Sequence, residues 1–272
     1  MKIAIMQPTF CPWIGYFKMI ELVGSFVFLD IVQFQRRSWQ GRNKIKLNGK
    51  EQWLSLHLQK APQQTLIKDM RLNNEQAWKN TLLKTLCHAY GKSVNFKEIY
   101  SILEFGLFHF ENLSELNIFL IEQFAGLLKL KTPLIKASSL SLPAVKRENL
   151  LLEICKALKA DEYLSPEGSK VYLEPAKDLF KNANINIEYF KMLHPSYTQQ
   201  NKNFIEYLGI IDLLFNTTNA AQILNDSIIV NDKAGGGGRA YNHYQKALIF
   251  LAFKFYLRLK FNLNFKLTKN LK

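Results

Sequence analysis

The first seventeen residues constrain the fold more than any other stretch of the chain. Residues 2–6 form a short apolar run, which is typical of a buried strand. Pro8 and Pro12 then exclude a regular strand or helix, and after Gly15 apolar residues recur at helical spacing. This order predicts a strand, a tight loop and a helix. In an α/β sheet, such a loop lies at the carboxyl end of the strand, where small ligands bind.

A second strand-like run, residues 25–29, ends in Asp30 and is followed by many polar and aromatic side chains. Two neighbouring parallel strands would bring both loops to the same end of one sheet. The alternative is that the prolines and aromatic residues only shape turns. From these loops we select the following candidate site residues: Gln7, Trp13, Tyr16, Asp30, Gln33, Arg42 and Asn43.

Strand-like and helix-like segments alternate along the rest of the chain. Asn48-Gly49 lies between two alternating segments and predicts a β-hairpin. A short strand is expected over 67–72 and a helical insertion over about 74–130. Further strands are expected at 133–137, 162–165 and 185–190, with helices over 147–159, 173–182 and 204–215.

This alternation favours an α/β fold with a mostly parallel, Rossmann-like sheet and helices on both faces. A helical insertion and a basic C-terminal tail complete the expected architecture. We expect one α/β domain over 1–219, a Gly-rich loop over 220–238 and a basic amphipathic tail over 239–272.

Much of the net charge of +14 comes from this tail, which contains eight Lys or Arg and no acidic residue. A general nucleic-acid-binding label for the whole chain is therefore not justified. Residues 257–267 alternate strictly between apolar and polar side chains. One interpretation is peripheral contact with an anionic membrane surface; the other is a docked terminal element with a solvated basic face.

The start of the chain and its cysteines indicate the compartment. Met1 leads directly into a strand without a small-residue cleavage site, and no apolar run is long enough to span a membrane. The three cysteines are odd in number and lack metal-ligand spacing. We therefore expect a cytoplasmic protein with free thiols and no metal, peripheral at the inner membrane if the tail binds lipid.

The second half of the chain adds polar residues at predicted strand ends, in loops and beside apolar helix faces. These are Asn117, Ser165, His194, Tyr197, Gln199, Asp212 and Asn216. Histidine is the usual general base near neutral pH, so His194 is the first catalytic candidate and Asp30 is its rival. Arg42 is suited to hold a phosphate. For each of these residues a purely structural role is the alternative.

Several motifs together resemble the WbqC-like family over roughly residues 1–217. They are Gln7-Pro8, Pro12-Trp13-Ile14-Gly15-Tyr16-Phe17, Phe28-Leu29-Asp30, Arg42-Asn43-Lys44-Ile45, Gln52-Trp53-Leu54, Tyr163-Leu164-Ser165, His194-Pro195 and Ile211-Asp212-Leu213-Leu214-Phe215-Asn216. The resemblance implies a role in bacterial surface-glycan biosynthesis, since such genes lie in O-antigen clusters, and a glycine transferase activity has been suggested for that family. The chain departs from the family at Ile31, where a second acid is common, so a metal role that needs a carboxylate pair is in doubt.

The expected function is therefore transfer of a glycyl or related acyl group onto an amino sugar or nucleotide sugar. The donor would be activated by ATP or already joined to a carrier such as aminoacyl-tRNA. The first loop also resembles that of HxGH-type nucleotidylyltransferases, but Trp13 and Tyr16 replace both histidines. The alternative is a non-catalytic nucleotide-sugar or glycan binder, or a membrane-docked scaffold.

Overall fold

The computed structural model describes residues 1–230, which group into two compact units. The larger unit contains Lys2–Ser141 and Met192–Ile228. The smaller unit contains Met1, Leu142–Lys191 and the described residues that follow Ile228. Each unit is described separately below.

The larger unit is built on three parallel strands in the order β5-β2-β1. Strand β1 (Lys2–Met6) pairs with β2 (Ser25–Phe28), which pairs with β5 (Leu134–Lys136). Helix α1 (Ile14–Glu21) forms the crossover between β1 and β2. Every residue of β2 is buried, which agrees with its central position and its uninterrupted apolar sequence.

A separate antiparallel hairpin joins β3 (Arg42–Leu47) to β4 (Lys50–Ser55). Both turn residues, Asn48 and Gly49, have positive φ angles of 51° and 75°. This is the backbone that an Asn-Gly dipeptide favours in a two-residue hairpin turn. The predicted hairpin is therefore confirmed.

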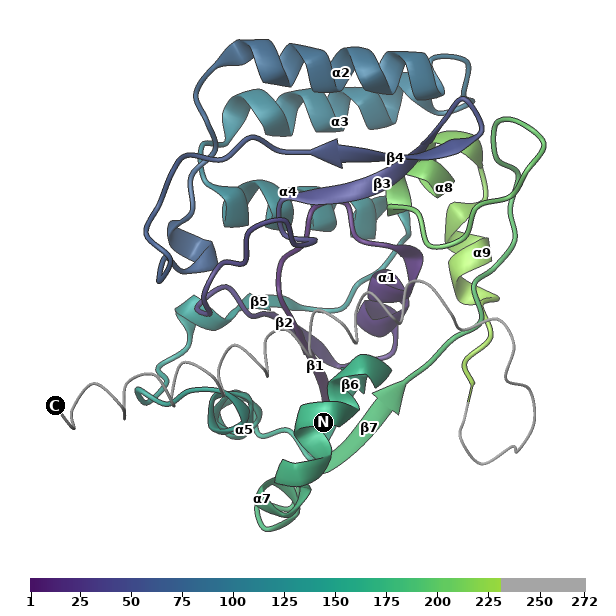
Figure 1. The fold of residues 1–272 in the computed structure, drawn as a ribbon. Helices are drawn as coiled ribbons and strands as arrows, with labels where there is room; N and C mark the ends of the chain where they lie inside the picture. The colour runs from purple at the N-terminus through teal and green to yellow at the C-terminus, as the bar shows by residue number, and fades with distance from the viewer. Residues whose placement is uncertain (231–272) are drawn as a thin grey trace, which may run out of the picture. The chain divides into compact units, whose positions relative to one another are not determined.

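Three helices form the predicted insertion: α2 (Gln76–Tyr90), α3 (Phe96–His109) and α4 (Leu113–Leu127). Helix α2 packs against α3 and β3, and α3 packs against α4 (Figure 1). Asn112 caps α4, because its side-chain oxygen accepts hydrogen bonds from the backbone N–H groups of Ser114 and Glu115.

Two predicted elements of the larger unit are wrong. Residues 67–72 do not form a strand; they begin with a 3₁₀ turn, η1 (Ile67–Asp69), and make only isolated bridges. The predicted helix over 204–215 begins only at α8 (Ile210–Asn216), because Tyr207 has a φ of 57° and the side chain of Gln199 bonds the backbone of Ile205. Helix α9 (Ala220–Asn225) occupies the first residues of the predicted Gly-rich loop.

The smaller unit contains α5 (Glu148–Ala157) and the parallel pair β6 (Glu162–Pro166) and β7 (Asn186–Phe190). Pro175 interrupts the helix predicted over 173–182. The segment instead consists of short turns: η3 (Glu167–Ser169), α6 (Lys170–Leu173), η4 (Glu174–Ala176) and α7 (Lys177–Lys181).

The prediction of an α/β fold with mostly parallel strands is confirmed, since only β3 and β4 pair in antiparallel fashion among the named strands. Within residues 1–230, no helix is long and apolar enough to cross a membrane. The predicted tail over 239–272, with its expected membrane or tRNA contacts, lies outside the described residues.

Candidate functional site

Two buried asparagines hold the loop that follows β1. The Asn43 Nδ2 donates to the carbonyl oxygens of Phe10 at 3.1 Å and Cys11 at 2.8 Å. The Asn117 Nδ2 donates to the carbonyl oxygens of Pro8 at 3.1 Å and Gln40 at 2.8 Å. Both asparagines, predicted as substrate-binding residues, thus bond to backbone and fix the loop that presents Trp13.

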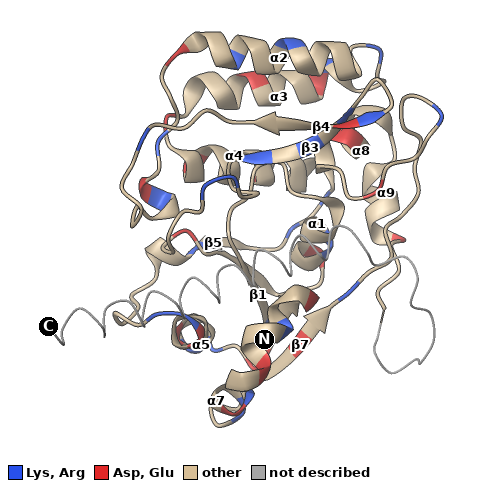
Figure 2. Ribbon diagram, viewed as in Figure 1, with Lys and Arg blue, Asp and Glu red and all other residues tan. Residues whose placement is uncertain are grey.

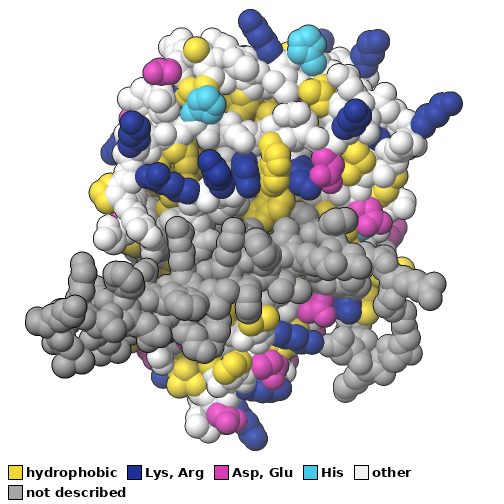
Figure 3. All heavy atoms as spheres, in the orientation of Figure 1, with side chains coloured by type: hydrophobic (Ala, Val, Ile, Leu, Met, Phe, Trp, Pro, Cys, Tyr) yellow, Lys and Arg dark blue, Asp and Glu magenta, His cyan; other side chains and the backbone are white. Residues whose placement is uncertain are grey.

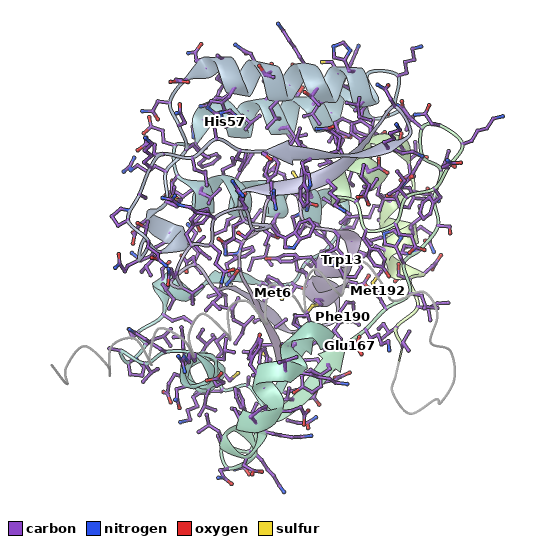
Figure 4. The ribbon with its side chains drawn as sticks, viewed as in Figure 1. Met6, Trp13, His57, Glu167, Phe190 and Met192 are labelled. Atoms are coloured by element: carbon purple, nitrogen blue, oxygen red, sulfur yellow. The ribbon has the colours of Figure 1, made fainter. Side chains whose placement is uncertain are left out.

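Trp13 lies at the start of α1, with extended backbone angles, and Figure 4 labels it there. Its indole ring covers Gly15 so closely that a Cβ atom on Gly15 would lie 2.2 Å from the ring. The glycine is therefore needed for this ring position. Tyr16 points into the core instead: it is buried, and its hydroxyl donates to the carbonyl oxygen of Gln7 at 3.1 Å.

His194 lies at the centre of a group of rings. We call Trp13, His194, Tyr197, Phe204 and Tyr207 the aromatic cluster. The His194 ring stacks on Trp13 with centroids 6.4 Å apart, and Tyr207 meets it edge-on at 4.9 Å. The ring centroids of Tyr197 and Phe204 lie 6.2 Å and 5.9 Å from that of His194. The cluster brings residues from the first loop and from the loop after residue 192 together within the larger unit.

The surroundings of His194 keep its imidazole neutral. Burial lowers the pKa of His194 from 6.5 to about 4, and the hydrogen bond with Pro195 opposes this shift only in part. Nδ1 lies 2.9 Å from the carbonyl oxygen of Pro195. A carbonyl accepts a hydrogen bond only from N–H, so in the neutral ring Nδ1 carries the proton and Nε2 carries the lone pair. His194 can therefore accept a proton through Nε2 at neutral pH.

Next to this cluster lies a buried carboxylate with its own donors. Asp212 is 0% exposed; Oδ1 accepts a hydrogen bond from the Tyr90 hydroxyl at 2.7 Å and Oδ2 accepts one from Tyr197 at 3.0 Å. Burial raises the pKa of Asp212, while the two tyrosine hydroxyls and the charge of Lys46 lower it. Tyr197 is thus shared between the carboxylate and the aromatic cluster.

Two further side chains complete what we call the Asp212 network, which comprises Lys46, Tyr90, Tyr197, Gln199 and Asp212. The Gln199 Nε2 donates to the Tyr197 hydroxyl at 3.3 Å, and its Oε1 accepts from the Lys46 Nζ at 3.3 Å. Lys46 is 3% exposed and also donates to the carbonyl oxygens of Asn201 and Asn203. Asn216 donates to the Asp212 carbonyl oxygen at 2.8 Å, which ties it to the same helix turn.

Other predicted site residues lie elsewhere in the larger unit. The Asp30 carboxylate accepts hydrogen bonds from the Ser138 N–H at 2.9 Å and the Ser138 hydroxyl at 2.5 Å, so it joins the ends of β2 and β5. No hydrogen bond connects it to His194 within residues 1–230. Gln33 is exposed and donates to the carbonyl oxygen of Gln63 at 2.6 Å.

Gln7 and Ser165 also bond to neighbours in their own units. The Gln7 Oε1 accepts from the Gln40 Nε2 at 2.7 Å in the larger unit. Ser165, at the end of β6 in the smaller unit, lies 2.7 Å from the Ser169 hydroxyl and is 0% exposed. Their substrate-binding roles stay predictions.

Arg42 stands apart from these closed networks. Its guanidinium carbon lies 4.1 Å from the centroid of the Trp53 ring, and its buried Nε has no hydrogen-bond partner within residues 1–230. Trp53 is 38% exposed and packs on Trp39 at 5.2 Å. The arginine is thus oriented by a ring rather than by an acid.

Sequence reasoning missed three residues of the site. Tyr90 was expected only on the apolar face of a helix, and Tyr207 was expected inside one. Lys46 lies on the same face of β3 as Arg42 and Lys44, and this alternation at every second residue is the signal that could have identified it. Nothing in the sequence pairs Tyr90 with Asp212, since 122 positions separate them.

The larger unit also has a hollow of about 860 Å³ that none of the predicted site residues lines. Its charged lining residues include Glu21, Glu98 and Lys129. No group of three His, Cys, Asp or Glu side chains suited to a metal ion occurs in the described part of the chain.

Comparison with known proteins shows the family to which the chain belongs. The model of the WbqC-like protein family matches residues 7–223, and the chain belongs to this family. A relative from Mycobacterium tuberculosis, described as uncharacterized protein Rv1507c, is 29% identical over 221 residues, which cover 79% of this chain and 93% of the relative. No solved structure matches the chain.

Proposed function

We propose that this protein transfers an aminoacyl (glycyl) or related acyl group onto the amine of an amino sugar or nucleotide sugar in bacterial surface-glycan biosynthesis. The observation that carries the proposal is the neutral His194 ring, whose Nε2 keeps its lone pair at neutral pH, inside a group of aromatic side chains. Membership of the WbqC-like family supports the glycan context.

The aromatic cluster suits a sugar better than a purely apolar ligand. Trp13, Tyr197 and Tyr207 offer ring faces for the C–H groups of a pyranose. The cluster residues are half-buried or exposed, so the rings are accessible in part to solvent. A sugar bound there would lie against the His194 ring.

The reaction requires one proton acceptor. The sugar amine attacks the carbonyl carbon of an activated acyl donor, the new C–N bond forms, and the bond from that carbon to the leaving oxygen breaks. The amine nitrogen becomes acidic as it bonds, so its proton passes to Nε2 of His194 and then to the leaving oxygen or to water. The donor in this scheme is an ester or a mixed anhydride.

In this scheme the Asp212 network does not react; it holds Tyr197 in place. Asp212 and Gln199 hold the Tyr197 hydroxyl, which fixes one wall of the aromatic cluster. Asp30 remains the alternative base; its two hydrogen bonds from Ser138 already use both carboxylate oxygens, which favours His194 for the proton transfer.

The test is a direct assay of amide formation. Purified protein is incubated with an amino sugar or its nucleotide derivative and with glycine in an activated form (glycyl adenylate or glycyl-tRNA), and the product is followed by mass spectrometry. General base catalysis is worth roughly a hundredfold or more, so His194→Asn should reduce kcat by at least about that factor. His88→Asn, on an exposed face of α2, is the matched control and should retain full rate.

The pH profile adds an independent readout. Since burial lowers the pKa of His194 to about 4, kcat/KM divided by the unprotonated fraction of the sugar amine should stay level from pH 7 to about pH 5 and fall only below that. A His194→Asn enzyme that turns over at the wild-type rate would overturn the proposal. So would unchanged amino sugar after incubation with every activated donor, an outcome that favours the non-catalytic glycan-binding scaffold.

A further inference from the structure

Two arginines of the larger unit, Arg37 and Arg42, form no ion pair with a carboxylate within residues 1–230. Arg42 is half-buried on Trp53, and Arg37 is exposed. By contrast, Arg71 pairs with Glu111 at 3.4 Å. We call Arg37 and Arg42 the arginine pair.

The arginine pair concentrates positive charge. Burial lowers the pKa of Arg42, and the charge of Arg37, five positions away along the chain, lowers it further. The buried Nε of Arg42 has no acceptor within the described residues. An anion with several oxygens would give the unpaired donor an acceptor. It would also offset the two positive charges.

Stacking on Trp53 prepares Arg42 for such a ligand. The ring holds one face of the guanidinium at 4.1 Å, which limits its rotamers while leaving its N–H edges free of protein carboxylates. A planar guanidinium matches the oxygens of a phosphate in pairs, whereas a lysine ammonium offers only a point charge. The geometry therefore selects phosphate rather than a diffuse anionic surface.

Strand β3 carries Arg42 near one end and Lys46, which bonds to the Asp212 network beside the aromatic cluster, near the other. Arg42, Lys44 and Lys46 occupy alternate positions of β3 and so share one face. Lys44 is paired with Glu51 at 2.5 Å, and Lys46 bonds to Gln199 of the Asp212 network. Figure 2 shows basic residues along β3, and Figure 3 shows Lys and Arg side chains in a row over that strand in the same view.

From Arg42 to Lys46 the strand rises about 13 Å. A substrate that carries its phosphates at one end and its amine at the other would therefore place its phosphates at the Arg42 end of β3, with the amine end toward the aromatic cluster, because Lys46 is buried beneath Asn201 and Asn203. We infer that the arginine pair binds the diphosphate of the sugar substrate. That this diphosphate belongs to the substrate rests on the function proposed above. That the arginine pair binds an anion does not depend on that function.

The experiment measures binding without turnover. Isothermal titration calorimetry of the full chain uses inorganic pyrophosphate as probe at low and at moderate salt. Arg42→Ala and Arg37→Ala should each weaken binding by about tenfold or more, because each removes charged hydrogen bonds to phosphate. The matched control is Arg36→Ala, which removes the same charge from the same loop, but whose guanidinium bonds to the Ala61 carbonyl oxygen.

Arg36→Ala should change the affinity by less than about threefold, as expected for a screened charge outside the site. Melting temperatures without ligand exclude misfolding, and Arg37 is exposed and does not pack on Trp53, so its variant tests the site even if Arg42→Ala is unstable. Equal losses in all three variants, or pyrophosphate binding no tighter than sulfate binding, would overturn the inference.

Two further probes identify the source of the diphosphate. Uridine diphosphate represents a nucleotide-linked sugar, and farnesyl diphosphate represents a lipid-linked one. Tighter binding of either probe than of pyrophosphate, lost in Arg37→Ala, supports the site and names its class. If the pair binds pyrophosphate while the acyl-transfer assay yields no product, the binding site stands and only the proposed reaction fails.

Discussion

The Asp212 network and the arginine pair are both charged regions of the larger unit, yet they differ in how the charge is compensated. Every oxygen of the Asp212 carboxylate has a donor from the chain itself, at 2.7 Å and 3.0 Å. The guanidinium of Arg42 has a tryptophan ring and no carboxylate within residues 1–230. The first arrangement stabilises the fold, and the second leaves binding capacity for a ligand.

The largest expected effect comes from breaking the closed network. Asp212→Ala removes the acceptor of the buried Tyr90 hydroxyl and of the half-buried Tyr197 hydroxyl and should lower the free energy of unfolding by about 3 kcal/mol, because each orphaned donor costs roughly 1 to 3 kcal/mol. Urea unfolding followed by circular dichroism measures it. Asp212→Asn keeps one acceptor and should lose less; a loss below about 1 kcal/mol in Asp212→Ala would contradict this description of the network.

His194 sharpens the comparison, because its Nδ1 bonds to the Pro195 carbonyl oxygen, whereas its Nε2 has no hydrogen bond within residues 1–230. The unfolded chain takes up a proton on this residue near pH 6.5, but the folded protein does so only near pH 4. Stability contributed by the neutral ring is therefore present above pH 6.5 and is lost as the pH falls toward 4.

This pH-dependent loss should reach about 3 kcal/mol at most. Urea unfolding at pH 7, 5 and 4 measures it against His194→Asn, which carries no titrating ring at this position. The difference in the free energy of unfolding between the two proteins should shrink as the pH falls. A constant difference across this range would show that burial does not depress the pKa of His194.

Gly209 offers a way to disturb the Asp212 network without changing any of its side chains. It precedes α8, and a Cβ atom there would lie 2.8 Å from the Cys11 carbonyl oxygen. Gly209→Ala should therefore cost about 2 kcal/mol through forced backbone movement.

The matched control is Gly126→Ala in α4, where a Cβ atom meets nothing within 4 Å. It should be neutral or stabilising by up to about 1 kcal/mol. Thermal unfolding of both variants checks the pair. Similar losses in both would mean that the space around Gly209 can relax.

The smallest expected effect on stability comes from the open region. Arg42→Ala removes the contact with Trp53 and should cost about 1 kcal/mol or less, since a partly exposed cation–π contact is worth little. Arg42→Lys keeps a cation over the ring and should cost still less. A loss as large as that of Asp212→Ala would mean that Arg42 serves the fold and not a ligand.

Local patterns along the chain were enough to predict most elements. The apolar run 2–6, the prolines and Gly15 led to the strand, loop and helix at the start, and Asn48-Gly49 led to the hairpin. Three predicted elements failed for different reasons. The Gln199 side chain bonds the backbone of Ile205 and holds it in a loop, and such a bond leaves little trace in the hydrophobic period. Pro175 interrupts the helix predicted over 173–182, and residues 67–72 make only isolated bridges.

Five of the residues that the structure groups together were selected from the sequence, whereas Lys46, Tyr90 and Tyr207 were not. Trp13, His194, Tyr197, Gln199 and Asp212 were all selected, and the structure brings these five together. Asp30, selected as a rival base, bonds to Ser138 instead. The sequence pattern identifies polar residues at strand ends, but it does not show which of them are in contact in the folded protein.

What the sequence determined by itself is the alternation of strands and helices, the hairpin turn and the family, since all three follow from short-range periodicity and motif spacing. Only the tertiary structure decided that Tyr90 and Asp212, 122 positions apart, share a hydrogen bond and that Arg42 has a ring in place of an acid. Pairings of this kind depend on how buried surfaces pack, and packing between distant segments brings polar groups together that no local pattern relates.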